Sequence, residues 1–252
     1  MLNIRSAAGK PRCTSRLSTQ LVFVEQKFDT GVVVESLVEV QGYSGSAPMR
    51  EPIPVLSALQ GLLPGGLPRG QVVTVDAPGA LPLALVAGAV PVGVPTVDLW
   101  CGVVGLPECG VLAAAGMGAN LDRLVLVDKP GERWADVVAT LLSATRMVLV
   151  QPPAPPPIGV IRRLTAIARQ HGAALVVIGP WEGARLRLQV TSSLWTGLEH
   201  GYGHLQGRRV KVVADGRGAG VRPRSAWLWL PGPDGSVASA DLEVVDTLEA
   251  AG

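Results

Sequence analysis

One turn of the chain has the position of a phosphate-binding loop. The turn Ala77-Pro-Gly-Ala-Leu-Pro-Leu-Ala84 joins a predicted strand at Gln71–Asp76 to a predicted apolar helix at Leu81–Val90. A working loop in this position reads G-x-x-x-x-G-K-[ST]. Its backbone N–H groups surround the phosphates, its lysine neutralises their charge and its hydroxyl holds Mg²⁺. The residue types at three of these positions decide whether the turn can bind a nucleotide.

All three positions carry side chains that cannot do this chemistry. Pro82 stands in the place of the second glycine and has no N–H to donate, Leu83 replaces the lysine and Ala84 replaces the hydroxyl residue. One charge pair is worth about 4 kcal/mol at an effective dielectric of about 20, which is roughly a thousandfold in affinity. The turn, with Ala77 and Gly79, therefore predicts a degenerate nucleotide site without ATPase activity. The alternative is an ordinary strand-turn-helix unit that never bound a nucleotide.

Composition sets further limits. The chain has 252 residues, 48% of them apolar, and a formal charge of +2, so no global polyelectrolyte argument applies. Its three cysteines, Cys13, Cys101 and Cys109, form no C-x-x-C pair and predict reduced thiols rather than a disulfide framework. His200 and His204 lack further ligands nearby, so no metal site is predicted. We find no signal peptide or membrane span in the pattern, and expect a cytoplasmic protein.

The order of the predicted elements indicates an α/β fold. Apolar strands alternate with helices of 10 to 15 residues up to Pro180, as in a mostly parallel central sheet flanked by helices. The remaining predicted strands and helices of this part are Thr96–Trp100, Leu124–Val127, Arg146–Val150 and Ala174–Ile178, and Val55–Leu62, Pro107–Met117, Glu132–Ser143 and Pro157–His171. Beyond Pro180, strands at Leu186–Val190, Val210–Val213 and Ala226–Leu230 are joined by glycine-rich turns and predict an antiparallel extension at the C-terminal side.

Three segments follow from these patterns. Residues 1–48 are an N-terminal extension, either a β-hairpin or a poorly ordered arm, because two β-rich runs follow a polar, basic start. Residues 49–237 form the core with the degenerate loop. Residues 238–252 form an acidic tail.

A basic region lies in the predicted antiparallel extension. It holds eight basic residues against Glu199 and Asp215 and is a candidate contact surface for DNA or for a protein partner. The basic residues are Arg185, Arg187, Arg208, Arg209, Lys211, Arg217, Arg222 and Arg224. Trp181, Trp195, Trp227 and Trp229 lie in the same region and could stack on single-stranded bases. The competing interpretation is that Trp227 and Trp229 alternate with leucines on a strand buried on both faces.

The chain also resembles a known family. The stretch Gly65-Gly-Leu-Pro-Arg-Gly-Gln-Val-Val before a strand-turn-helix unit resembles the opening of the RecA-type core. The closer resemblance is to the actinobacterial RecA-like accessory proteins of the mutasome, the ImuA-prime group of the ImuA family. It covers residues 51–237 and is carried by segments in the same order. These segments are Leu62-Leu-Pro-Gly-Gly-Leu-Pro-Arg-Gly, Cys101-Gly-Val-Val-Gly-Leu-Pro, Gly179-Pro-Trp-Glu-Gly, Gly207-Arg-Arg-Val and Trp227-Leu-Trp-Leu-Pro-Gly-Pro-Asp-Gly.

The resemblance implies a role in DNA-damage-induced mutagenesis without catalysis by the chain itself. Its implied partners are the catalytically dead Y-family polymerase homologue ImuB and an error-prone DnaE-type polymerase. In RecA-type cores a glutamate follows the second strand and an aspartate ends the fourth. The stretch Leu99-Trp-Cys-Gly102 and residue Gln151 stand in those places, without a carboxylate, and Gln151 is a poor partner for Mg²⁺. No cofactor is therefore expected. An enzyme with an unrecognised site is the remaining alternative.

Overall fold

The computed structural model describes residues 18–27, 33–42, 52–93, 100–199, 202–216 and 222–240. The chain divides into two compact units, Met1–Met49 and Arg50–Gly252. In the first unit, β1 (Ser18–Lys27) pairs antiparallel with β2 (Val33–Gly42). The rest of this section concerns the second unit, which carries the candidate site.

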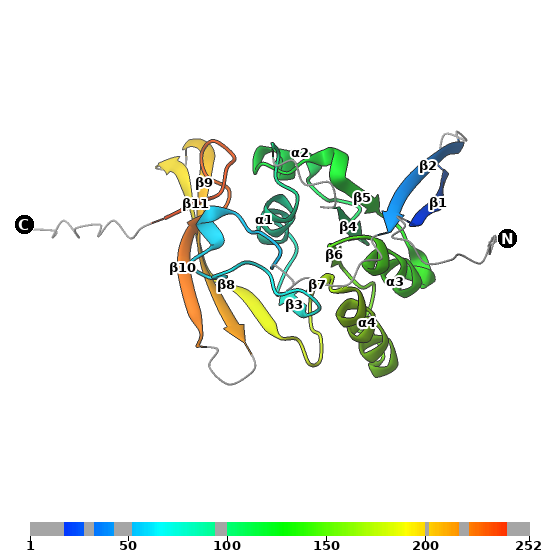
Figure 1. Cartoon of the computed structure of the whole chain (residues 1–252). Coiled ribbons are helices and arrows are strands. Elements are labelled where there is room, and N and C mark those ends of the chain that lie inside the picture. Colours follow the sequence, from blue (N-terminus) through cyan, green and yellow to red (C-terminus); the bar gives the residue numbers. More distant parts are fainter. Residues whose placement is uncertain are drawn as a thin grey trace, which may run out of the picture. The chain divides into compact units, whose positions relative to one another are not determined.

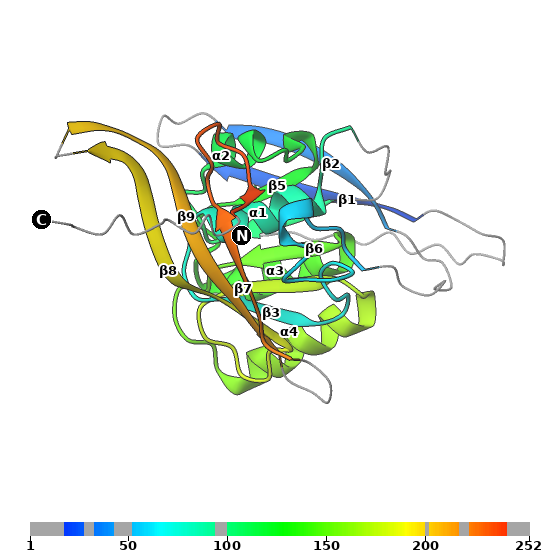
Figure 2. The same ribbon diagram turned by 90° about the vertical axis from the view of Figure 1, so that its left-hand side faces the viewer.

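A nine-stranded sheet organises the second unit, in the order β11-β10-β9-β8-β3-β7-β6-β4-β5 (Figures 1 and 2). The pairs from β5 to β8 are parallel, and those from β8 to β11 are antiparallel. The strands are β3 (Val72–Val75), β4 (Cys101–Val104), β5 (Leu124–Val127), β6 (Met147–Val150), β7 (Ala174–Ile178), β8 (Leu186–Glu199), β9 (Tyr202–Gly216), β10 (Arg224–Trp229) and β11 (Ala238–Ser239). The predicted α/β fold, a RecA-like, mostly parallel sheet with an antiparallel C-terminal extension, is confirmed.

Helices cover both faces of the parallel strands, because these strands are apolar on both sides. Alternate residues of one strand enter different core clusters: Val73 packs on the side of α1, and Val72 on the side of α3 and α4. The α-helices in the described part of the chain are α1 (Ala80–Ala89), α2 (Val111–Gly116), α3 (Trp134–Ala144) and α4 (Ile158–His171). Single 3-10 turns are η1 (Ser57–Leu59), η2 (Leu121–Arg123) and η3 (Gly131–Arg133).

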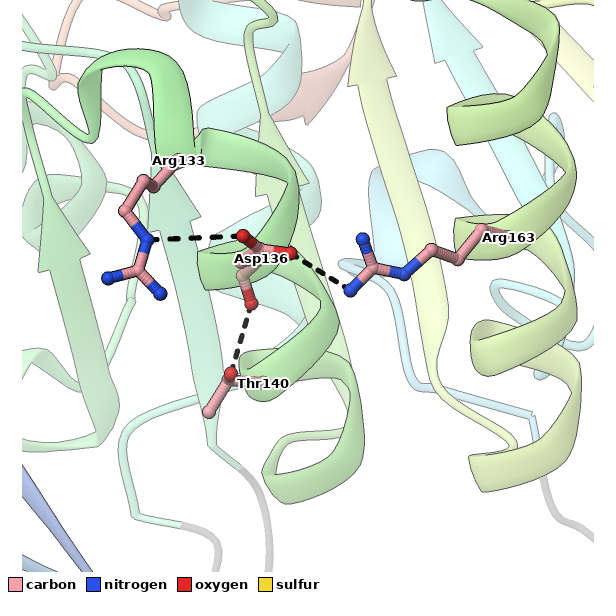
Figure 3. A network of polar contacts seen from close by, with 4 residues as sticks. All are labelled: Arg133, Asp136, Thr140 and Arg163. Atoms are coloured by element: carbon pink, nitrogen blue, oxygen red, sulfur yellow. Dashed lines mark hydrogen bonds and ion pairs between the residues drawn. The ribbon is translucent and has the colours of Figure 1, made fainter. Parts of the chain in front are cut away.

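The exposed surface of α3 and α4 carries a small polar network (Figure 3). The Asp136 carboxylate accepts a hydrogen bond from Arg163 Nη2 at 2.9 Å and lies 3.9 Å from Arg133 Nε. The side chains of these three residues are about half exposed, and exposed pairs of this kind contribute about 0–1 kcal/mol. The helices are therefore held together by Val138, Leu142, Leu164 and Ala168 beneath them.

Three predicted elements differ from the structure. The predicted helix Val55–Leu62 is only the 3-10 turn η1, followed by turns as far as Gly66. The predicted helix Pro107–Met117 begins at Val111, after Gly110. The predicted strand Thr96–Trp100 was placed too early: β4 begins at Cys101, and residues 94–99 lie outside the described residues.

Two of the antiparallel strands, β8 and β9, are much longer than their hydrophobic runs predict. Only Leu186–Leu188 of β8 pairs with β3, whereas its pairing with β9 continues as far as Glu199. Thr191 is an extra residue in β8, which leaves it unpaired between Val190 and Ser192. Beyond this bulge the two strands form a bent ribbon that leaves the body of the sheet (Figure 2). This part of β8 was not predicted because its sequence, Thr191-Ser-Ser-Leu-Trp-Thr-Gly197, is polar, contains glycine and lacks a hydrophobic pattern.

Candidate functional site

The turn after β3 leads directly into α1, as predicted. Ala77, Pro78 and Gly79 are exposed. Gly79 precedes the helix with φ of +127°, a conformation that favours glycine, and no side chain caps the helix start. Pro82 is the third residue of α1, where a backbone N–H has no partner inside the helix and proline is tolerated. The backbone layout of a phosphate loop is thus present in outline.

The first turns of α1 are buried on all sides. Leu83 is 8% exposed and Ala84 is fully buried, and every residue from Leu81 to Ala89 is buried. A Cβ built on Gly110 would lie 3.6 Å from Leu83 Cδ1, so Leu83 lies against the start of α2. On another side, Gly88 lies against the backbone of Val55 and Leu56. The places of the lysine and the hydroxyl are therefore part of the hydrophobic core.

Gly102 is not at the end of a strand, which corrects the sequence-based placement. It is the second residue of β4, and a Cβ added there would lie 2.9 Å from Leu141 Cδ1 of α3. The residues that follow the strand are Gly105 and Leu106, and Leu106 is 8% exposed. The first carboxylate after β4 is that of Glu108, which is exposed. Gly105 and the apolar Leu106 therefore occupy the two positions after the strand, and neither carries a carboxylate.

Gln151 follows β6, at the end where the Walker B aspartate of a RecA-type core stands. Its backbone N–H donates to the Val104 carbonyl at 3.0 Å, and its side chain is half-buried. Only β7 lies between β6 and β3, so Gln151 and the Ala77–Ala84 turn share one sheet edge, about 10 Å apart in the hydrogen-bonding direction. The topology thus brings the predicted positions to one edge, but these positions carry no lysine, hydroxyl or carboxylate.

One further polar side chain at this edge, that of Asp76, was not singled out from the sequence. The Asp76 carboxylate accepts a hydrogen bond from the Val190 N–H at 3.0 Å, next to the β8 bulge. Burial raises the pKa of the Cys101 thiol, at the start of β4, to about 12. Burial, and then the negative charge of Asp128, raise the pKa of Cys109. Both thiols stay protonated at neutral pH and so are poor nucleophiles. Within the described part of the chain, no three His, Cys, Asp or Glu side chains are placed to hold a metal ion.

The basic region is divided between the two faces of the antiparallel sheet. Arg208 and Arg209 are adjacent and point to opposite faces. The Arg208 guanidinium lies 5.7 Å from the Trp195 ring centre, and its Nε donates to Ser193 Oγ at 2.7 Å. The Arg209 guanidinium lies 5.5 Å from the Trp229 ring. Arg185, Arg187, Arg222 and Arg224 are exposed, Lys211 is half-buried, and Arg217 lies outside the described residues.

The tryptophans do not form the predicted two-sided buried strand. Leu228 and Leu230 are buried, whereas Trp227 and Trp229 are half-buried and belong to neither core cluster. Trp181 is buried beside α4, where its Nε1–H donates to Thr165 Oγ1 at 3.4 Å. Trp181 is therefore separate from the basic region.

Fold and site together define an α/β protein of RecA-like architecture in which core side chains fill the phosphate-loop position. The family model of the MT3502 N-terminal domain matches residues 61–183, which end just before β8. The chain is 31% identical to the uncharacterized protein Rv3395c of Mycobacterium tuberculosis over 176 residues, which are 62% of this chain and 80% of that protein. The chain belongs to this family of MT3502-type proteins. Among the described residues, no helix has the length and apolar character needed to cross a membrane.

Proposed function

We propose that the chain is a non-catalytic, RecA-like accessory protein of DNA-damage-induced mutagenesis that acts through protein partners. The observation that carries the first half is the burial of Leu83 and Ala84, in the places of the lysine and the hydroxyl. The second half is supported by the segments between residues 51 and 237 that resemble ImuA-prime proteins and follow one another in the same order. The match to a mycobacterial relative agrees with an actinobacterial resemblance.

The proposed partners are an ImuB-type Y-family polymerase homologue and a DnaE-type error-prone polymerase. In this proposal the chain works in the cytoplasm during the SOS response and supports translesion synthesis. The sheet and α1 serve as a rigid body that presents docking surfaces, and its folded conformation does not depend on ATP binding. The buried start of α1 suits this role, because a core helix does not move with a nucleotide.

We predict that the protein neither binds nor hydrolyses Mg-ATP. The missing lysine alone removes about 4 kcal/mol of charge interaction, or roughly a thousandfold in affinity. Isothermal titration calorimetry with Mg-ATP is expected to show no binding heat, whereas an ATPase with an intact loop in the same buffer gives a full curve. Binding in the micromolar range would contradict the non-catalytic assignment.

A partner experiment tests the second half. The tagged full chain is captured from cells before and after DNA damage, and the bound proteins are identified by mass spectrometry. A Y-family polymerase homologue is expected after damage, and the purified pair is expected to co-elute in size-exclusion chromatography. Failure of the purified pair to co-elute, with both proteins folded, would overturn the partner assignment while leaving the ATP result unaffected.

A further inference from the structure

The solvent side of the antiparallel sheet combines positive charge with aromatic side chains. We call it the outer face and define it by the residues of β8, β9 and β10 that alternate with the core residues Leu188, Val210, Val212 and Leu228. Its members are Arg187, Gln189, Ser192, Leu194, Arg209, Lys211, Val213, Asp215, Ser225, Trp227 and Trp229. Three of them are cationic and one is anionic, so the face is positive.

Cross-strand pairing places the cations next to the indoles. Lys211 lies directly opposite Trp227, and Arg209 directly opposite Trp229. On the other side of β9, Leu194 lies opposite Arg209 and is 55% exposed. Side chains directly opposite in an antiparallel pair have Cβ atoms about 5 Å apart. The charged and aromatic groups therefore form one continuous surface rather than two separate patches.

None of these cationic or aromatic side chains is needed to fill the hydrophobic core. Neither tryptophan belongs to a core cluster, although their strand neighbour Leu228 does and Ala226 packs against the same cluster. A strand that needed only a solvated outer side would carry short polar residues there, such as the Ser225 of β10. Two large indoles beside cations on a solvated sheet face indicate a ligand that is both flat and anionic.

We propose that the outer face binds single-stranded DNA, with bases stacked on Trp227 and Trp229 and phosphates held by Arg187, Arg209 and Lys211. Stacking on aromatic side chains together with phosphate contacts is how proteins hold single strands without sequence preference. A paired duplex hides its base faces inside the stack, so its bases cannot stack on Trp227 and Trp229. The choice of DNA over RNA rests on the proposed function in DNA damage. The binding itself rests only on the outer face.

The size of the effect follows from the number of cations. For a single strand, the logarithm of the binding constant falls linearly with the logarithm of the salt concentration, with a slope of about −0.7 per phosphate contact. Three contacts give a slope of about −2. Binding is therefore expected to be weak at physiological salt and clear at low salt.

The test measures binding of a fluorescent dT20 oligonucleotide by anisotropy, with the full chain at several salt concentrations. Lys211→Glu is expected to lower the affinity about 5- to 10-fold and to reduce the slope by about 0.7. Trp227→Ala is expected to cost about 5- to 100-fold, and Trp227→Phe should recover most of the loss, because a ring that stacks remains. Circular dichroism and thermal melting of each variant check that it folds.

Two matched controls separate the outer face from charge in general. Arg208→Glu changes the net charge as Lys211→Glu does, but Arg208 lies on the opposite face beside Trp195. Arg162→Glu makes the same change on the exposed side of α4. Both controls are expected to keep the wild-type slope. Equal losses in the controls and in Lys211→Glu would show a long-range charge effect and overturn the site.

Three further outcomes also overturn the proposal. The first is tighter binding to rU20 than to dT20, and the second is tighter binding to a duplex than to dT20. The third is that poly-glutamate competes with dT20 equally well for the wild type and for Trp227→Ala. The last result would assign the face to an acidic protein segment. A folded Lys211→Glu variant that loses dT20 but still co-elutes with the polymerase homologue would separate DNA binding from the proposed partner function. A folded Lys211→Glu variant that keeps dT20 binding but no longer co-elutes would assign the outer face to the protein partner and overturn the DNA site.

Discussion

Leu83→Lys is expected to lower the free energy of unfolding of the Arg50–Gly252 unit by about 4 kcal/mol and to create no ATP binding. Leu83 is 8% exposed and packs between α1 and the start of α2. Replacing it removes about 2 kcal/mol of apolar burial and places an ammonium group in the hydrophobic core. The effective cost of an unpaired buried charge is several kcal/mol, and part of it is relieved when the lysine tip reaches towards water.

Thermal and urea unfolding measure this change directly. For a unit of about 200 residues, 1 kcal/mol corresponds to about 2–4 °C, so the midpoint should fall by roughly 10 °C. Leu83→Met is the matched control, because it keeps the volume and the apolar character and should cost less than about 1.5 kcal/mol. An unchanged midpoint together with new Mg-ATP binding would mean that the loop is an open site, and would refute its place in the core.

The parallel half of the fold could be predicted because its strands are continuous apolar runs, most of them buried on both faces. The runs at Leu124–Val127 and Ala174–Ile178 are continuous, apolar and bounded by turns or helices, and the structure gives them the predicted limits. The strand at Cys101–Val104 was misplaced because Gly102 is a weak β-former. Gly102 is favourable there only because Leu141 packs over it, a contact that depends on the position of α3.

The candidate sites could be predicted only in part, because the number of basic residues in a segment does not say on which face of the sheet each side chain lies. The basic residues between Arg185 and Arg224 were found from the sequence, but their division depends on the register of β8, β9 and β10. The extra residue Thr191 shifts the alternation of β8 by one position. No single-sequence pattern contains that shift. The predicted degenerate nucleotide site, in contrast, depends only on residue type at Leu83, Ala84 and Gln151, and needs no knowledge of the register.

Helix α1 is the element in which the predicted loss of the nucleotide site and the packing of the core meet. In a phosphate-binding protein the start of this helix faces the ligand, and its dipole helps to hold the anion. Here the helix is apolar on every side and packs against the sheet, α2 and the chain at Val55 and Leu56. A helix of this kind contributes packing rather than ligand binding. Its close contact with the backbone at Val55 should therefore be sensitive to a single methyl group.

Gly88→Ala is expected to destabilise the Arg50–Gly252 unit by about 2 kcal/mol, although alanine is the better helix former. In an exposed helix this change stabilises by up to about 1 kcal/mol. At Gly88 the new Cβ would lie 2.6 Å from Val55 Cα and 2.7 Å from the Leu56 nitrogen, and backbone atoms cannot turn away as a side chain does. The segment at 55–56 would have to move off α1, and overpacking of this kind costs about 1–3 kcal/mol.

Gly159→Ala is the matched control, because Gly159 is the second residue of α4 and a Cβ there would meet nothing within 4 Å. The same chemical change should raise the free energy of unfolding at Gly159 by a few tenths to about 1 kcal/mol. Urea unfolding of the two variants therefore gives changes of opposite sign, since the propensity gain is common to both and the backbone contact exists only at Gly88. If both variants were stabilised equally, α1 would not be packed against residues 55–56. One side of the buried α1 helix would then be open to solvent.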